Sequence, residues 1–131
     1  MPLDAASAAG GWIGRTIGPH LPSTKRAHAN LRLALPAKSD AEYKKIVIEM
    51  WDNLGRIMAE YPHLEKIGRE RTEIVNTIPL QAMNKDGLPG IVFSGHLANW
   101  EIVMSGMLYQ AELPLDAIYR VPNNPGAAKL L

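Results

Sequence analysis

Apolar residues recur every three or four positions from residue 43 to residue 61, which is the spacing of one face of an α-helix. Ser39, with Glu42 three residues later, gives the capping-box pattern that opens such a helix, and Pro62 is expected to end it. The predicted apolar face carries Tyr43, Val47, Met50, Trp51, Leu54, Ile57, Met58 and Tyr61. Glu60 is less expected at the C-terminal end, where a carboxylate opposes the helix dipole, and the simplest interpretation is a solvated side chain.

Two weaker patterns precede this helix. Residues 1–22 are rich in Gly, Ala and Pro, which favours a loop or a short helix with little intrinsic order. Residues 25–35 form a basic amphipathic helix, which Ser23 and Thr24 can cap and Pro36 stops.

The second half of the chain has the pattern of a mixed α and β structure. Apolar runs at 90–95 and 115–121 predict buried strands, and residues 99–112 between them predict a helix. We also expect a short strand over 69–76 and a short helix over 79–85. Strand, helix and strand in this order indicate a βαβ unit. We therefore predict an α/β fold, with N-terminal amphipathic helices followed by a βαβ unit of a mixed or parallel sheet.

Composition and charge limit the classes of protein to which the chain could belong. The chain has 131 residues and no cysteine, which is compatible with one domain and excludes a disulfide scaffold and a thiolate nucleophile. The net charge of +1 hides an uneven distribution, because the segment from Arg15 to Lys38 holds five Lys and Arg but no Asp or Glu. Such a segment favours anionic lipid, an acidic protein or nucleic acid as a partner, and a solvated basic helix face is the alternative. No stretch reaches the roughly 20 apolar residues that span a bilayer.

The candidate chemistry lies where the first predicted strand of the βαβ unit ends. His96 follows that strand and Glu101 opens the next helix, at the edge where open α/β sheets bind ligands. A carboxylate that contacts the imidazole fixes its tautomer and stabilises the imidazolium, so the other ring nitrogen can act as a general base. A structural histidine is the alternative. The remaining histidines have no zincin-type spacing with this pair, and we predict no metal site.

Two further residues could contribute to the same site. Arg120 ends the second predicted strand, and neighbouring parallel strands would place it beside His96, where a guanidinium suits phosphate or carboxylate. A surface arginine is the alternative. Trp100 could line an acyl pocket, although a tryptophan in the first turn of a helix is more often part of the core.

The sequence Gly-His-Leu-Ala-Asn-Trp-Glu at residues 95–101, followed by Tyr-Arg at 119–120 and Asn-Pro at 124–125, resembles the bacterial lipid A biosynthesis acyltransferase family of lauroyl and myristoyl transferases. The sequence Asn-Leu-Gly-Arg at 53–56, together with Glu60, is similar to an earlier region of the same family. Family members commonly have Phe-Gly where this chain has Leu97 and Ala98, and Arg-Pro where it has Arg120 and Val121.

This resemblance implies an enzyme that moves an acyl group from an acyl-carrier-protein thioester to a hydroxyl of a phosphorylated glycolipid, without a metal or organic cofactor. It implies the cytoplasmic face of the inner membrane, an anionic membrane surface as partner, and no nucleic acid. His96 would be the base of a His-x4-Glu motif with Glu101 as its partner. Arg120, Asn99 and Trp100 would bind substrate.

The resemblance also carries an expectation about domain organisation. Members begin with a membrane-anchoring helix and continue past the Arg-containing strand, so we expect residues 1–131 to be one partial acyltransferase domain, truncated at its C-terminus. Within it, residues 1–38 would form the basic, membrane-proximal region and residues 39–131 the start of the catalytic core. A non-catalytic module that binds a membrane surface or the acyl carrier protein is the alternative function.

Overall fold

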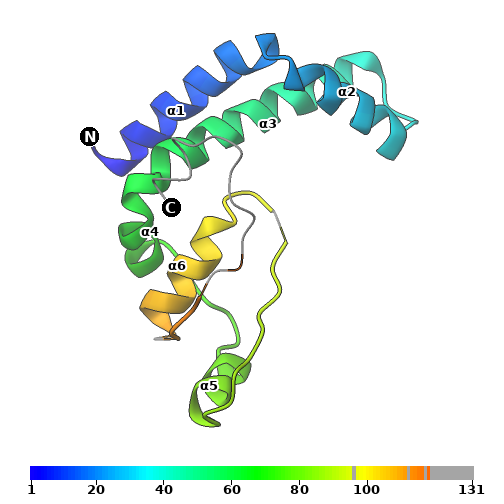
Figure 1. Ribbon diagram of the computed structural model, residues 1–131. Helices are drawn as coiled ribbons and strands as arrows, with labels where there is room; N and C mark the ends of the chain where they lie inside the picture. Colours follow the sequence, from blue (N-terminus) through cyan, green and yellow to red (C-terminus); the bar gives the residue numbers. More distant parts are fainter. Residues whose placement is uncertain (96, 112, 117, 119–131) are drawn as a thin grey trace.

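All regular structure in the described part of the chain is helical (Figure 1). The computed structural model describes residues 1–95, 97–111, 113–116 and 118. Its α-helices are α1 (Leu3–Ile17), α2 (Ser23–Ala34), α3 (Asp40–Glu60), α4 (Leu64–Glu70), α5 (Ile78–Lys85) and α6 (Glu101–Gln110), with 3-10 turns at Gly18–His20 and Tyr61–His63. None of these helices is long and apolar enough to cross a membrane.

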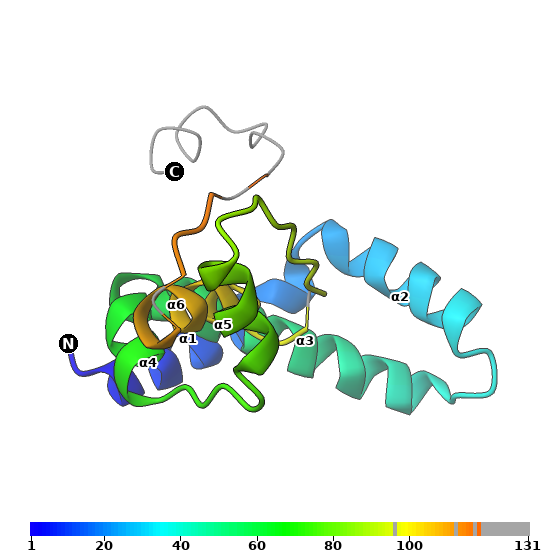
Figure 2. The same cartoon turned by 90° about the horizontal axis from the view of Figure 1, so that it is seen from below.

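The helices form two packed pairs that meet at the end of α3. The helices α1 and α3 lie side by side and antiparallel, and α2 packs against the first part of α3 (Figures 1 and 2). The helices α4 and α6 pack together beyond the other end of α3, whereas α5 lies apart from both pairs (Figure 1). Buried apolar side chains come from both pairs and from the segment after α6: Ala6, Tyr43, Val47, Ile57, Ile67 and Leu113.

The start of α3 confirms the predicted capping box. The Ser39 hydroxyl accepts a hydrogen bond from the backbone N–H of Glu42, and the Glu42 carboxylate accepts one from the backbone N–H of Ser39 at 2.8 Å. Lys38 adds an ion pair to the same carboxylate at 2.9 Å. These bonds favour the ionised form and lower the pKa of Glu42 to about 2. The helix ends at Glu60, and Pro62 lies in the 3-10 turn that follows it.

For residues 1–22 we predicted a loop or a short helix with little intrinsic order, and the structure has the 15-residue helix α1 there. Gly10, Gly14 and Gly18 recur at intervals of four residues on the side of this segment that faces α3. A Cβ atom at Gly10 would collide with the carbonyl of Gly55, and one at Gly14 with the carbonyl of Trp51. The glycines therefore allow two backbones to approach closely, and this packing outweighs the low helix propensity of glycine.

The basic helix predicted over 25–35 is confirmed as α2, but its predicted cap is wrong. The helix begins at Ser23, and no side chain caps it. Instead, the Thr24 hydroxyl donates to the carbonyl of Gly18 at 2.9 Å and accepts a hydrogen bond from the Trp51 indole at 2.8 Å. Thr24 thus joins α2 to α3 rather than closing its own helix.

The predicted βαβ unit is also wrong. Its helix is present as α6, but residues 91–95 form no strand, and Ile91 and Phe93 are 72% and 90% exposed. A strand is stable only when a neighbour completes its hydrogen-bond ladder, and no second strand lies beside this segment in the described part of the chain. Of the second predicted strand, the described residues 115, 116 and 118 are not in a strand, and the others lie outside the described residues.

The two short elements predicted before this unit had different outcomes. The helix expected over 79–85 is confirmed as α5. The strand expected over 69–76 is wrong, because its first two residues complete α4 and the others form a turn and an irregular segment.

Candidate functional site

Three of the predicted site residues open α6 and lie against the C-terminal end of α3. Asn99 and Trp100 directly precede the helix and Glu101 is its first residue, and all three are partly buried. His96 and Arg120, the other two predicted site residues, lie outside the described residues. The predicted contact between His96 and Glu101 therefore stays a prediction.

Glu60 connects this segment to two helices. Its Oε2 atom accepts a hydrogen bond from Nδ2 of Asn99 at 2.7 Å, and its Oε1 atom accepts one from the Ser7 hydroxyl in α1 at 2.7 Å. The solvated side chain that the sequence favoured for Glu60 is wrong, since both carboxylate oxygens have protein partners. Hydrogen bonds to an ionised acceptor are among the stronger ones in proteins, so this carboxylate fixes the position of Asn99.

The next residue along the chain binds the predicted catalytic carboxylate. The Tyr61 hydroxyl donates a hydrogen bond to Oε1 of Glu101 at 2.7 Å. Burial of the phenol and this bond to a carboxylate raise the pKa of Tyr61 to about 12. Tyr61 is therefore a neutral donor throughout the physiological range of pH, and it orients one oxygen of Glu101.

The rest of α6 is held by α4. The buried Ser105 hydroxyl donates to the carbonyl of Leu64 at 2.6 Å, and the Gln110 amide donates to the carbonyl of Gly68 at 2.6 Å. A Cβ atom at Gly68 would collide with Ser105, so glycine allows the two helices to touch. These contacts along α6 keep its first residue facing the end of α3.

The backbone just before the site adopts an uncommon conformation. Ala98 has a φ of 47°, in the left-handed region that favours glycine. An L-residue there costs roughly 1–2 kcal/mol. This backbone strain lies directly before Asn99, at the entry to α6.

A charged cluster supports Ser7, the second partner of Glu60. Asp52 in α3 binds Arg56 at 2.6 Å and Arg15 of α1 at 2.5 Å, and these guanidinium groups lower the pKa of Asp52. Arg56 also donates to the Ser7 hydroxyl at 3.3 Å. The ionised Asp52 thus holds Arg56 near Ser7, which is a partner of Glu60. Through Arg15 it also links α3 to α1.

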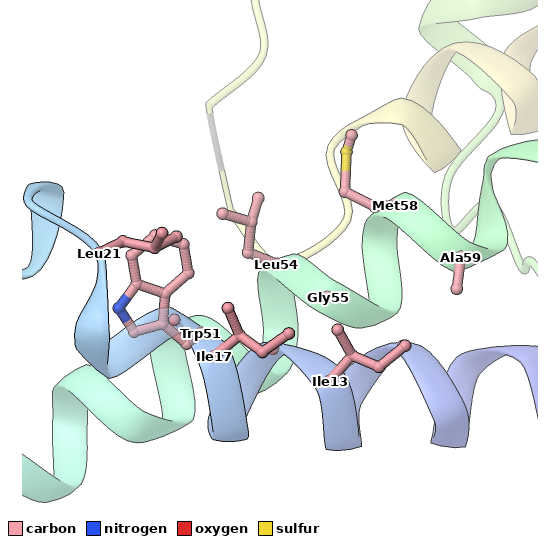
Figure 3. A pocket seen from close by; sticks show the side chains of 11 residues that line it. Ile13, Ile17, Leu21, Trp51, Leu54, Gly55, Met58 and Ala59 are labelled. Atoms are coloured by element: carbon pink, nitrogen blue, oxygen red, sulfur yellow. The ribbon is translucent and has the colours of Figure 1, made fainter.

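An apolar groove runs along the other side of the α1–α3 pair (Figure 3). Its volume is about 410 Å³. Ile13 and Ile17 of α1 point into it opposite Leu54 and Met58 of α3, and Trp51 closes one end (Figure 3). Ile13 and Met58 remain 48% and 60% exposed, so the groove is open to solvent.

The site offers hydrogen-bonding groups and carboxylates but no metal centre in the described part of the chain. No group of three or more potential metal ligands is found among the described residues. The described groups can orient a polar substrate or a partner base, because Glu60 and Tyr61 hold Asn99 and Glu101 in fixed positions.

Sequence reasoning missed Ser7 and Tyr61. We assigned Tyr61 to the apolar face of α3, but its hydroxyl reaches α6. Ser7 lies in the segment for which we predicted a loop or a short helix with little intrinsic order. The spacing of Gly10, Gly14 and Gly18 could have revealed the helix, since small residues four apart line one helical face.

Comparison with known proteins identifies a family. A sequence model of the family described as bacterial lipid A biosynthesis acyltransferase matches residues 1–130. No curated protein and no solved structure matches the chain.

Proposed function

The chain belongs to the bacterial lipid A biosynthesis acyltransferase family, and from this premise we propose the reaction that its site performs. We propose that it transfers a fatty acyl group, of the lauroyl or myristoyl type, from an acyl-carrier-protein thioester to a hydroxyl of a phosphorylated lipid A precursor. The observation that carries this proposal is a pair of hydrogen bonds at the end of α3, one that Asn99 donates to Glu60 and one that Tyr61 donates to Glu101. They fix the carboxylate of the His-x4-Glu motif, as a catalytic dyad requires.

In the proposed mechanism, His96 is the general base. Its imidazole removes the proton of the acceptor hydroxyl while that oxygen attacks the thioester carbonyl. The C–S bond of the tetrahedral intermediate then breaks, and the thiolate leaves and recovers the proton from the imidazolium. Glu101 would stabilise the imidazolium through Oε2, which has no partner among the described residues, while Tyr61 holds Oε1.

The remaining predicted residues would bind substrate. Arg120 would hold the phosphate of the acceptor, since its planar guanidinium binds phosphate in a bidentate manner. Asn99 and Trp100 would border the reacting groups. A thioester is already activated, so the proposed reaction needs no metal or organic cofactor. From the family we also propose the cytoplasmic face of the inner membrane as the place of reaction.

A transfer assay with acyl-carrier-protein thioesters and a phosphorylated lipid A precursor tests the proposal. We expect His96→Ala to lower kcat by about 10²–10⁴, the usual contribution of a general base. His20→Ala is the matched control, because His20 is exposed and lies in the turn between α1 and α2. A folded His96→Ala protein with the turnover of the unmodified chain would remove the proposed base.

A second candidate function is a non-catalytic module that binds an anionic membrane surface. It is favoured by the open apolar groove and by Lys25 and Arg26, which are exposed and have no ion pair among the described residues. Sedimentation with anionic vesicles tests this function. Binding that persists without any transfer activity would favour the module, whereas transfer activity that depends on His96 would favour the enzyme.

A further inference from the structure

Glu60 occupies a position that helix electrostatics disfavours. It is the last residue of α3, where the negative end of the helix dipole repels a carboxylate. Its two oxygens nevertheless bind groups from two different parts of the chain, the Ser7 hydroxyl of α1 and the Asn99 amide before α6. A residue kept only for the stability of α3 would be cationic or neutral at this position.

The carboxylate also decides which way the Asn99 amide faces. A carboxylate only accepts hydrogen bonds, so the amide must present Nδ2 to Glu60. Oδ1 of Asn99 is then buried, and it has no hydrogen-bond partner in the described part of the chain. An unpaired buried acceptor costs about 1–3 kcal/mol. The fixed orientation is therefore maintained against an energetic cost.

Asn99 lies two residues before Glu101, and both are bound by adjacent residues at the end of α3. Glu60 holds Asn99 at 2.7 Å and Tyr61 holds Glu101 at 2.7 Å. Because Glu60 and Tyr61 bind two residues that are only two positions apart, the start of α6 cannot rotate or slide without breaking one of these hydrogen bonds. The Ser7 hydroxyl holds the other oxygen of Glu60, and Arg56 in turn donates a hydrogen bond to that hydroxyl.

We propose that Glu60 is a positioning residue for acyl transfer, which holds Asn99 and thereby sets where the carboxylate of Glu101 lies. This inference rests on the proposed function. Glu60 acts through Asn99 and does not touch the reacting groups. Its loss should therefore lower kcat by a much larger factor than it raises KM for either substrate, although Asn99 itself is proposed to border the substrate.

The test uses the full chain and a reciprocal exchange. In Glu60→Gln, only one acceptor oxygen remains, so the new side chain can accept from the Ser7 hydroxyl or from the Asn99 amide but no longer from both. The negative charge is lost as well, and we expect kcat to fall about 10- to 100-fold, as for other supporting residues of active sites. KM should change by less than about threefold. The double variant Glu60→Gln/Asn99→Asp restores one donor and one acceptor at unchanged net charge, and we expect it to recover at least about tenfold of the loss. Glu49→Gln is the control, because Glu49 is exposed in the same helix and only pairs with Lys45 at 3.8 Å.

Three results would overturn the inference: an unchanged kcat in Glu60→Gln, a fall in kcat that the exchange does not recover, and a fall that Glu49→Gln reproduces. The His96→Ala variant separates this failure from that of the proposed function. Normal turnover in His96→Ala contradicts the function, whereas normal turnover only in Glu60→Gln contradicts the positioning role. If the unmodified chain transfers no acyl group, the function fails. The ¹⁵N resonance of the Asn99 side-chain amide then tests the contact, which is contradicted if Glu60→Gln leaves it unshifted.

Discussion

The Tyr61 hydroxyl donates a hydrogen bond to Oε1 of Glu101 at 2.7 Å, which joins the turn after α3 to the first residue of α6. The two residues are 40 positions apart, so the bond closes a long loop that contains α4 and α5. It is one of the two polar anchors that place the start of α6, and its strength can be measured directly.

We expect Tyr61→Phe to lower the free energy of unfolding by about 1.5–3 kcal/mol, the usual value of a hydrogen bond to a charged group. The ring remains in place, so only the bond to Glu101 is lost. Urea denaturation followed by circular dichroism measures the change. Tyr109→Phe is the control, because Tyr109 stacks against Arg69, with 4.3 Å from the guanidinium carbon to the ring centre, and its hydroxyl donates no hydrogen bond in the described structure. Equal effects of the two substitutions would contradict the assignment.

The same bond predicts a response to alkaline pH. The pKa of Tyr61 is raised from 10.0 to about 12 in the folded protein, first by burial and then by Glu101. The neutral phenol therefore stabilises the fold fully below pH 10, and this contribution disappears as the pH rises from 10 to 12. Titration of tyrosinate absorbance should show one fewer group ionising near pH 10 in the unmodified chain than in the unfolded one. The late group should be missing from Tyr61→Phe.

A third prediction concerns the start of α3. Ser39→Ala removes the hydroxyl that caps the helix and should lower the free energy of unfolding by about 1 kcal/mol. Ser23→Ala in the first turn of α2 should have little effect, because Ser23 caps nothing. Thermal or urea unfolding of the two variants compares them. A similar loss in both would mean that the capping box does not stabilise α3.

The capping box also predicts a response to acid. The lowered pKa of Glu42 means that its bonds to Ser39 and Lys38 stabilise the fold above pH 4.5 and are lost as the pH falls towards 2. We expect the difference in free energy of unfolding between the unmodified chain and Glu42→Gln to shrink as the pH falls from 4.5 towards 2. A difference that stays constant with pH would contradict the role of the ionised carboxylate.

The parts of the fold that the sequence predicted are those that local rules determine. The capping box at Ser39 and the three- and four-residue spacing that follows it require only neighbouring residues, and α3 appears as expected. The helix α1 depends on contacts between Gly10 or Gly14 and a helix about 40 residues away, so its composition alone was misleading. The apolar run at 90–95 was misleading in the opposite way, because its pattern fits a strand but a strand requires a partner.

The candidate site shows the same division. Asn99 and Glu101 could be chosen from the sequence because they belong to a contiguous motif. Their anchors Glu60 and Tyr61 lie 39 and 40 residues away, and nothing in the local sequence indicates a hydrogen bond across that distance.

The close approach of α1 and α3 gives the next prediction, in which two effects oppose each other. Gly14→Ala should gain about 1 kcal/mol from helix propensity. The new methyl group, however, would collide with the backbone carbonyl of Trp51, and overpacking costs about 1–3 kcal/mol. Because a backbone carbonyl cannot swing away, we expect a net loss of stability. Ala8→Gly, at an exposed position of the same helix, measures the propensity effect alone. A more stable Gly14→Ala variant would show that the two helices can separate at little cost.

The last prediction reverses the usual effect of glycine. Ala98 has a φ of 47°, in the left-handed region that glycine adopts more easily than other residues. Glycine relieves a strain of roughly 1–2 kcal/mol but gains freedom in the unfolded chain, so we expect Ala98→Gly to raise the free energy of unfolding by about 0.5–1 kcal/mol. Ala82→Gly, at an exposed position of α5, should lower it by about 1 kcal/mol. Urea denaturation of both variants measures whether each substitution raises or lowers the free energy of unfolding. Destabilisation by both would contradict the left-handed conformation at Ala98, and with it the backbone turn that directly precedes Asn99 and α6.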